Sequence, residues 1–278
     1  MADISFRETC HRLRREGCSL GEIIRVTGKP KTSVYHHIKD IFLSKMQKEN
    51  IEKQRLLAVT SFHQKRKGKS KLNRHPLPFL EWKPATVGLI GHFLFDGEIT
   101  HSACVYTNRS KALINKVQSE MKALYPYPPR IITINSDTYR MSYFNVELAA
   151  YMKEKSEELL QNILHLNREC KREFLKSFFD DEGSVYFIKK KRMVRGYQHS
   201  ITILRLVKEL LSEFGILSNI DAKYFEINIT GYENIARFAA EIGFSKGLAI
   251  NPKRANSIWK RRIEKRKLLS MALASYKI

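Results

Sequence analysis

Cysteine is scarce in this chain of 278 residues. Its four copies, Cys10, Cys18, Cys104 and Cys170, are scattered, and none belongs to a Cys-x-x-Cys pair or lies beside a histidine cluster. This distribution disfavours a zinc site and a disulfide framework, and it indicates reduced thiols in a cytosolic protein. The sequence also lacks a long apolar run or an amphipathic anchor, so we expect no membrane partner.

Acidic residues are scarce at both ends of the chain. Residues 1–75 contain 18 Lys and Arg against 7 Asp and Glu, and residues 246–278 contain 10 against 1, whereas the middle is nearly neutral. Basic ends around a neutral core are typical of a protein that binds a polyanion, which favours nucleic acid. The N-terminus has no basic-then-apolar signal segment, so we expect a cytoplasmic, nucleoid-associated protein.

Two similar segments lie in the middle of the chain, LIGHFLFDGE (89–98) and LKSFFDDEGS (175–184). Each reads as an apolar helix that ends in an acid followed by glycine, and the two acids, Asp96 and Glu182, are 86 residues apart. The same offset relates Glu147 to Glu233. A repeat at this period predicts two copies of one module about a pseudo-twofold axis, which would bring Asp96 and Glu182 together.

Both segments resemble the LAGLIDADG motif of the homing endonucleases in the two-motif, single-chain form. The resemblance covers roughly residues 85–250, and the second copy, FLKSFFDDEGSV, is the closer match. In the first copy Leu94 stands where the family has an aspartate, Phe95 replaces a usually small residue, and Glu98 replaces a small hydroxyl residue. The acid and the glycine at the end of the motif are kept in both copies.

The resemblance implies that Asp96 and Glu182 bind the divalent ions, Mg²⁺ or Mn²⁺, each serving one strand of a DNA duplex. Phosphodiester hydrolysis needs an activated water, a stabilised leaving oxygen and a neutralised phosphate, and divalent ions supply all three. Mg²⁺ prefers one or two carboxylates together with phosphates and water, which suits one acid from each module.

Other residues near the motifs have roles that are open or structural. The family usually places a Lys or Gln near each acid. Candidates are Lys189 and Lys190 for the second site, and only His101 or Arg140 for the first. The remaining motif residues are assigned as follows: Asp180 and Asp181 to helix capping or ion pairs rather than metal binding, His92 to a buried hydrogen bond, and Gly91 and Ser177 to close approach of the motif helices.

We predict an α+β protein with five regions: a helix-turn-helix domain (1–43), a basic linker (44–80), a first module (81–165), a second module (166–250) and a basic helical tail (251–278). Hydrophobic periodicity predicts the first module's elements at 86–96, 98–107, 109–125, 130–135, 138–144 and 146–163, and the tail helix at 253–267. By resemblance, two αββαββα modules form a saddle on the DNA major groove.

The segment from Ser19 to Ile41 resembles a helix-turn-helix unit, with a capping box from Ser19 to Glu22 and a turn at Gly28. A helical hairpin with a solvated basic face is the alternative. We predict DNA contacts from this unit, from the second module's basic hairpin and neighbouring strands, and from the tail: Arg25, Lys29, Lys31, Thr32, Tyr35, His36, Arg140, Lys191, Arg192, Arg195, Lys253 and Arg254.

The sequence favours a monomeric, site-specific double-strand DNA endonuclease. Two alternatives remain: a transcription regulator that keeps the fold without cleavage, and an intron maturase whose partner is structured intron RNA. The changes at Leu94 and Phe95 favour the regulator. Retention of both acids favours the nuclease, because two carboxylates beside phosphates repel them unless metal is bound.

Overall fold

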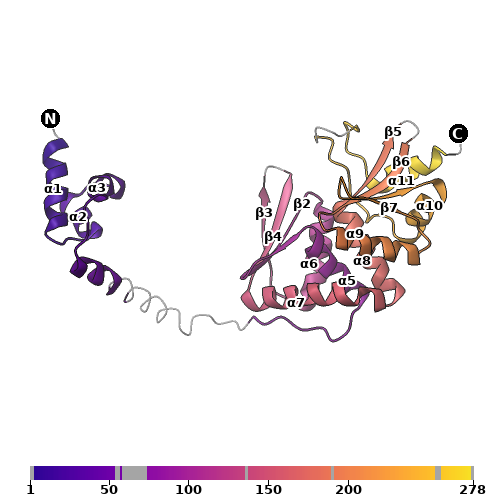
Figure 1. Ribbon diagram of the computed structural model, residues 1–278, viewed down its shortest axis with the longest axis horizontal. Helices are drawn as coiled ribbons and strands as arrows, with labels where there is room; N and C mark the ends of the chain where they lie inside the picture. Colours follow the sequence, from indigo (N-terminus) through magenta and orange to yellow (C-terminus); the bar gives the residue numbers. More distant parts are fainter. Residues whose placement is uncertain are drawn as a thin grey trace. The chain divides into compact units, whose positions relative to one another are not determined.

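The computed structural model describes residues 3–53, 57, 74–134, 137–188, 191–253 and 258–276. The chain divides into two compact units, Met1–Asn73 and Arg74–Ile278 (Figure 1). Three residues with predicted roles, Lys189, Lys190 and Arg254, lie outside the described residues, as does most of the predicted linker.

The described part of the first unit begins with the helices α1 (Asp3–Arg15), α2 (Leu20–Thr27) and α3 (Lys31–Ile38), and residues 45–53 are helical as well. The predicted capping box begins α2: the Ser19 amide donates to Glu22 Oε2 at 2.7 Å, and the Glu22 amide donates to Ser19 Oγ at 3.3 Å. Gly28 ends α2 in the left-handed region at φ 65°, a conformation that glycine adopts without strain. The helices share a small core made of Cys10, Leu13, Ile23, Val34 and Ile38.

The second unit contains two modules of the same plan. The elements of the first are α5 (Pro84–Phe95), β1 (Gly97–Ile99), β2 (Ala103–Asn108), α6 (Lys111–Leu124), β3 (Arg130–Ile134), β4 (Thr138–Phe144) and α7 (Val146–Asn162). After a 3₁₀ turn (Ile163–His165), those of the second are α8 (Arg168–Glu182), β5 (Gly183–Ile188), β6 (Lys191–Tyr197), α9 (Ile201–Glu213), β7 (Asn219–Asp221), β8 (Glu226–Thr230) and α10 (Tyr232–Glu241), followed by α11 (Lys265–Ala274).

The two sheets have equivalent strand orders, β1-β2-β4-β3 and β5-β6-β8-β7, and all pairings are antiparallel. Figure 1 shows the two sheets of this unit, pink and orange, with α5 and α8 between and below them. The predicted α+β fold with two equivalent modules is therefore confirmed. None of the described helices is long and apolar enough to cross a membrane.

The predicted apolar stripes are buried. In α6 the stripe of Leu113, Val117 and Met121 is at most 1% exposed, and in β4 Met141 and Tyr143 face the same core. One continuous hydrophobic cluster runs through both modules and includes Ile263, Leu268, Leu269 and Ala272 from the C-terminal segment. The module pair and the C-terminal helix therefore share a single core.

Two predicted elements differ from the structure. The expected strand 98–107 is a hairpin, because Thr100 Oγ1 accepts the amide of Ala103 at 3.1 Å and closes a tight turn between β1 and β2. The expected helix 253–267 is wrong as well: among the described residues of this segment, helix begins only at Lys265. Instead, Glu264 forms a β-bridge with Ala249 and the Lys265 amide donates to Leu248 O at 2.7 Å, because edge pairing satisfies these backbone groups before α11 starts.

Candidate active site

The two motif helices, α5 and α8, pack directly against each other, and small residues at equivalent positions permit this. A Cβ added to Gly91 would lie 2.1 Å from Ser177 Oγ and 3.0 Å from Ser177 Cβ. Ser177 itself is fully buried and donates to Phe174 O at 2.8 Å. The close approach predicted for this pair is confirmed.

Gly91→Ala is expected to lower the free energy of unfolding by about 1–3 kcal/mol, because the new methyl group overlaps Ser177 in a core that is already filled. Adding Ser177→Gly should recover part of that loss, although a glycine inside a helix itself costs roughly 1 kcal/mol. Denaturant unfolding of the single and double variants measures both effects. If the double variant loses the full sum of the single losses, contact with Ser177 does not limit residue 91.

Each motif helix delivers its acid to the start of a strand. Asp96 is the C-cap of α5 and Glu182 is the last residue of α8; both are partly exposed. Gly97 and Gly183 follow, and an added Cβ would lie 2.4 Å from Phe93 O and 2.2 Å from Phe179 O. Only glycine allows the strand to begin directly after the helix here, which fixes the position of each acid relative to its sheet.

Asp96 is held from the first sheet. Asn108 Nδ2, at the end of β2, donates to Asp96 Oδ2 at 2.7 Å. Burial, with a smaller contribution from the nearby Asp181, raises the pKa of the Asp96 carboxyl to about 6, and the Asn108 hydrogen bond opposes the shift. A desolvated carboxyl beside a second acid gains from a cation, so the donor chemistry of this position suits a divalent ion.

Asp181 crosses from the second module into the first. Its side chain is fully buried; Oδ1 accepts from Tyr106 Oη at 2.6 Å, and Oδ2 lies 2.8 Å from His92 Nδ1. Burial raises the pKa of the Asp181 carboxyl well above its usual range and lowers the pKa of His92 to about 4. His92 is therefore neutral at pH 7, and the buried hydrogen-bonding role predicted for it is confirmed.

The contact between Asp181 and His92 has an aromatic counterpart at the equivalent positions of the repeat. Phe95, 86 residues before Asp181, crosses into the second module and packs edge-on against Phe178 with ring centroids 5.1 Å apart. Phe178 is in turn the counterpart of His92. One side of the pseudo-twofold junction is thus apolar and the other is hydrogen-bonded.

Asp180 and Lys265 close the C-terminal end of α8. Lys265 Nζ is buried and donates to Asp180 O at 2.8 Å and Phe179 O at 3.3 Å, whereas Asp180 Oδ1 accepts the Ser245 amide at 2.8 Å. Burial lowers the pKa of the Lys265 ammonium, and four carboxyl groups oppose this, in decreasing order Asp180, Asp181, Asp96 and Glu182. The buried Lys265 ammonium therefore interacts electrostatically with acids of both modules.

The described residues contain no group of three or more His, Cys, Asp or Glu side chains arranged to hold a metal ion. A site with one or two carboxylates leaves most of a coordination shell to water and phosphate oxygens, as Mg²⁺ prefers. Asp180 and Asp181 are bonded within the protein, in agreement with the structural roles expected of them.

The structure distributes the predicted DNA-contact residues over several surfaces. All six in the first unit are exposed: Arg25, Lys29, Lys31, Thr32, Tyr35 and His36. In the second unit Lys191 and Lys253 are exposed, and Arg140 lies 3.7 Å from Glu98.

Two predicted DNA-contact arginines of β6 bind within the protein. Arg192 donates to Ser275 Oγ at 2.5 Å and to Ser275 O at 2.6 Å, and its guanidinium stacks over Tyr276. Arg192 thus holds the end of α11. Arg195 donates to Glu226 at 3.3 Å and lies over the Tyr186 ring.

Three residues of the junction were not predicted from the sequence: Tyr106, Asn108 and Lys265. Cys104, Tyr106 and Asn108 alternate on one face of β2, but the strand predicted over 98–107 ended one residue before Asn108. Lys265 lies in a basic run that reads as solvated, and its burial follows only from the docking of α11.

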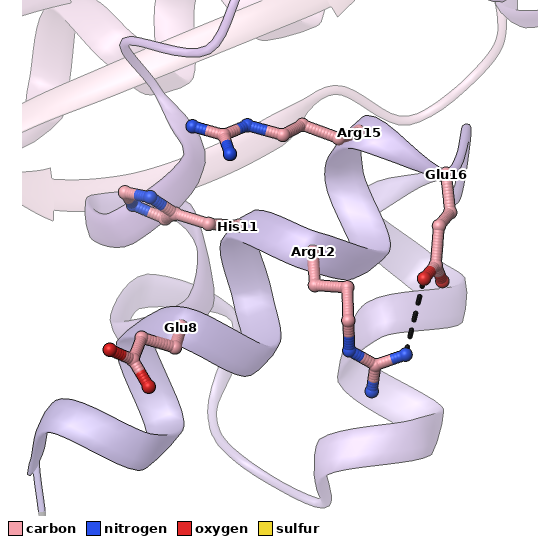
Figure 2. A pocket seen from close by; sticks show the side chains of 5 residues that line it. All are labelled: Glu8, His11, Arg12, Arg15 and Glu16. Carbon is pink, nitrogen blue, oxygen red and sulfur yellow. Dashed lines mark hydrogen bonds and ion pairs between the residues drawn. The ribbon is translucent and has the colours of Figure 1, made fainter.

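A surface hollow lies on α1 of the first unit. It is lined by Glu8, His11, Arg12, Arg15 and Glu16, and Figure 2 shows the Arg12–Glu16 ion pair along the helix at 3.2 Å. The i, i+4 spacing explains that pair without a ligand.

The fold and the paired motif helices define an α+β protein of two related modules with one acid from each at their junction. Residues 169–243, most of the second module, match the family model of the LAGLIDADG-like domain. The second module is therefore similar to the LAGLIDADG-like domain, which confirms the resemblance inferred from the motifs. No curated protein matches the chain.

Similar solved structures include I-DmoI in complex with DNA and Mn, at 18% identity and a TM-score of 0.46, covering 58% of this chain and 96% of that one. Another is the full-length DUF199/WhiA protein from Thermatoga maritima, at 16% identity and a TM-score of 0.48, covering 73% of this chain and 63% of that one. At these identities and TM-scores, neither likeness assigns an activity.

Proposed function

We propose that this protein is a site-specific double-strand DNA endonuclease that hydrolyses phosphodiesters with Mg²⁺ or Mn²⁺ at Asp96 and Glu182. One observation carries the proposal: α5 and α8 pack against each other and end at equivalent positions in acids, each followed by a glycine that starts a strand. Ionised carboxyl groups near one another repel, and a bound divalent cation relieves that repulsion.

In this proposal the bound ions would activate the attacking water and neutralise charge on the phosphate. The protein's own residues fix the geometry. Gly97 and Gly183 set each acid at the start of a sheet, and Asn108 orients the Asp96 carboxyl by holding one oxygen. Lys265 holds the C-terminal end of α8, next to Glu182, by donating to the carbonyl groups of Phe179 and Asp180.

The first unit is proposed to add DNA contacts outside the cleavage site. Its exposed residues Lys31, Thr32, Tyr35 and His36 lie on α3, the third helix of the predicted helix-turn-helix, which would enter the major groove. Arg25 and Lys29 are exposed before it and suit phosphate.

A transcription regulator without cleavage is the second candidate, and the first motif favours it. Leu94 and Phe95 pack into the apolar core where the second copy has Asp180 and Asp181, so the two copies are not chemically equal. Such a protein would bind the same DNA without needing either acid.

Cleavage of DNA spanning the locus of gene insertion tests the proposal. With Mg²⁺ the wild-type protein should make a discrete double-strand cut, and Asp96→Asn or Glu182→Gln should reduce the rate by several orders of magnitude. Glu98→Gln is the matched control, since Glu98 neighbours Asp96 but is exposed. Tight Mg²⁺-independent binding to the DNA with no cut, together with full biological effect of both amide variants, would establish the regulator.

A further inference from the structure

The carboxylate of Asp96 is the end of a hydrogen-bond chain that begins in the other module. Asp181, on α8, accepts from Tyr106 Oη at 2.6 Å. Tyr106 Oη accepts in turn from Asn108 Nδ2 at 3.4 Å, and the same Nδ2 donates to Asp96 Oδ2 at 2.7 Å. The chain therefore passes from the second module's motif helix through β2 of the first module to the first module's candidate metal ligand.

Two periodicities place these groups in line. His92 and Asp96 are four residues apart and share a face of α5, while Tyr106 and Asn108 are two apart and share a face of β2. His92 and Tyr106 also contact each other, with ring centroids 5.8 Å apart. Asp181 makes hydrogen-bond contacts with both His92 and Tyr106, and Asn108 donates to Asp96.

The second module does not repeat this chain. Tyr106 lies opposite Gly97 of β1, and Gly196 lies opposite the equivalent Gly183 of β5. The positions equivalent to Tyr106, Asn108 and Asp181 therefore hold Gly196, Gln198 and Phe95. Gly196 and Phe95 have no polar side-chain atom, so the Tyr106–Asp181 hydrogen bond has no counterpart there. Gln198 does resemble Asn108, because its Oε1 accepts the Ser200 amide at 3.4 Å as Asn108 Oδ1 accepts the Ser110 amide at 2.8 Å. The hydrogen bond that joins the neighbouring motif helix to the strand beside Asp96 therefore has no equivalent on the Glu182 side.

We propose that Asp181, Tyr106 and Asn108 are positioning residues for Asp96 alone, so that the two acid positions are unequal and the two DNA strands are cut at different rates. The proposal rests on the proposed nuclease function for its strand consequence. The positioning itself depends only on the buried hydrogen bonds, because networks of this kind couple their members beyond pairwise contact.

A thermal double-variant cycle tests the positioning without DNA or metal. Tyr106→Phe removes one hydroxyl and is separated from Asp96 by Asn108, so its effect on Tm should depend on whether residue 96 is Asp or Asn. The Tm shift of the double variant is expected to differ by about 2–4 °C from the sum of the shifts of Tyr106→Phe and Asp96→Asn. Val117→Ala, in the same module's core but outside the chain of bonds, should combine additively with Asp96→Asn. Additive shifts for Tyr106→Phe would overturn the proposal.

Strand-specific nicking tests the consequence. On a cleavage target labelled on either strand, Asn108→Ala should slow one strand by about tenfold or more relative to the other, because a hydrogen bond to a charged ligand is lost on one side only. Val117→Ala should slow both strands equally. An unchanged strand ratio in Asn108→Ala overturns the inequality. If the wild-type protein never cuts DNA but the Tm shifts are non-additive, the proposed nuclease function is contradicted while the positioning of Asp96 by the hydrogen-bond chain is still supported.

Discussion

Lys265→Met is expected to destabilise the protein by roughly 3–5 kcal/mol, the cost typical of removing one partner from a buried charge cluster. The ammonium donates to two carbonyl groups at the end of α8 and is the shared counter-charge of Asp180, Asp181, Asp96 and Glu182. Methionine keeps the apolar stem, so the loss reports on charge and hydrogen bonding. Urea unfolding at pH 7.5 measures it.

Lys267→Met is the matched control, because Lys267 lies on the same helix, is exposed and should change stability by no more than about 0.5 kcal/mol. The loss in Lys265→Met should also shrink at pH 5, where the carboxyl groups with raised pKa take up protons and repel one another less. A loss of the same size at both pH values would mean that Lys265 acts through packing alone.

The repeated parts of the fold and the close packing of the motif helices were predictable, whereas the polar partners of the acids at the junction were not. The acid–glycine ends at Asp96 and Glu182, their equal spacing and the apolar stripe of α6 are properties of single segments, so periodicity and motif sufficed. Asp181 shows the limit. Its neighbours in the chain describe a helix end, and nothing local says that this carboxylate is buried in another module.

Lys265 and Asn108 were missed for the same physical reason. A lysine within a basic run is most often solvated, and Lys265 is buried only because residues 248–250 pair with the segment before α11 and bring that helix onto the core. Asn108 matters only because the strand is one residue longer than periodicity indicated. Contacts between distant segments decide both cases.

Asp96→Asn is expected to stabilise the metal-free protein by up to about 3 kcal/mol at pH 7.5, because a carboxyl whose pKa rises from 3.8 to about 6 on folding is penalised when ionised. The folded state binds the proton more tightly than the unfolded state, so the penalty is fully present above pH 6 and disappears as pH falls below 3.8. Asparagine retains an oxygen that can accept from Asn108 Nδ2.

The measurement is the difference in unfolding free energy between Asp96→Asn and wild type at pH 7.5 and pH 5, where the advantage should fall to about half. The difference is needed because His92, with its pKa lowered to about 4, makes both proteins less stable as pH falls from 6.5. Glu98→Gln, an exposed neighbour paired with Arg140, should give no such advantage. If Asp96→Asn does not raise the free energy of unfolding at pH 7.5, the ionised Asp96 carboxyl carries no desolvation penalty in the wild-type protein. The strain that makes it a candidate ligand would then be absent, because a carboxylate without that penalty gains no more from a cation than an ordinary surface acid.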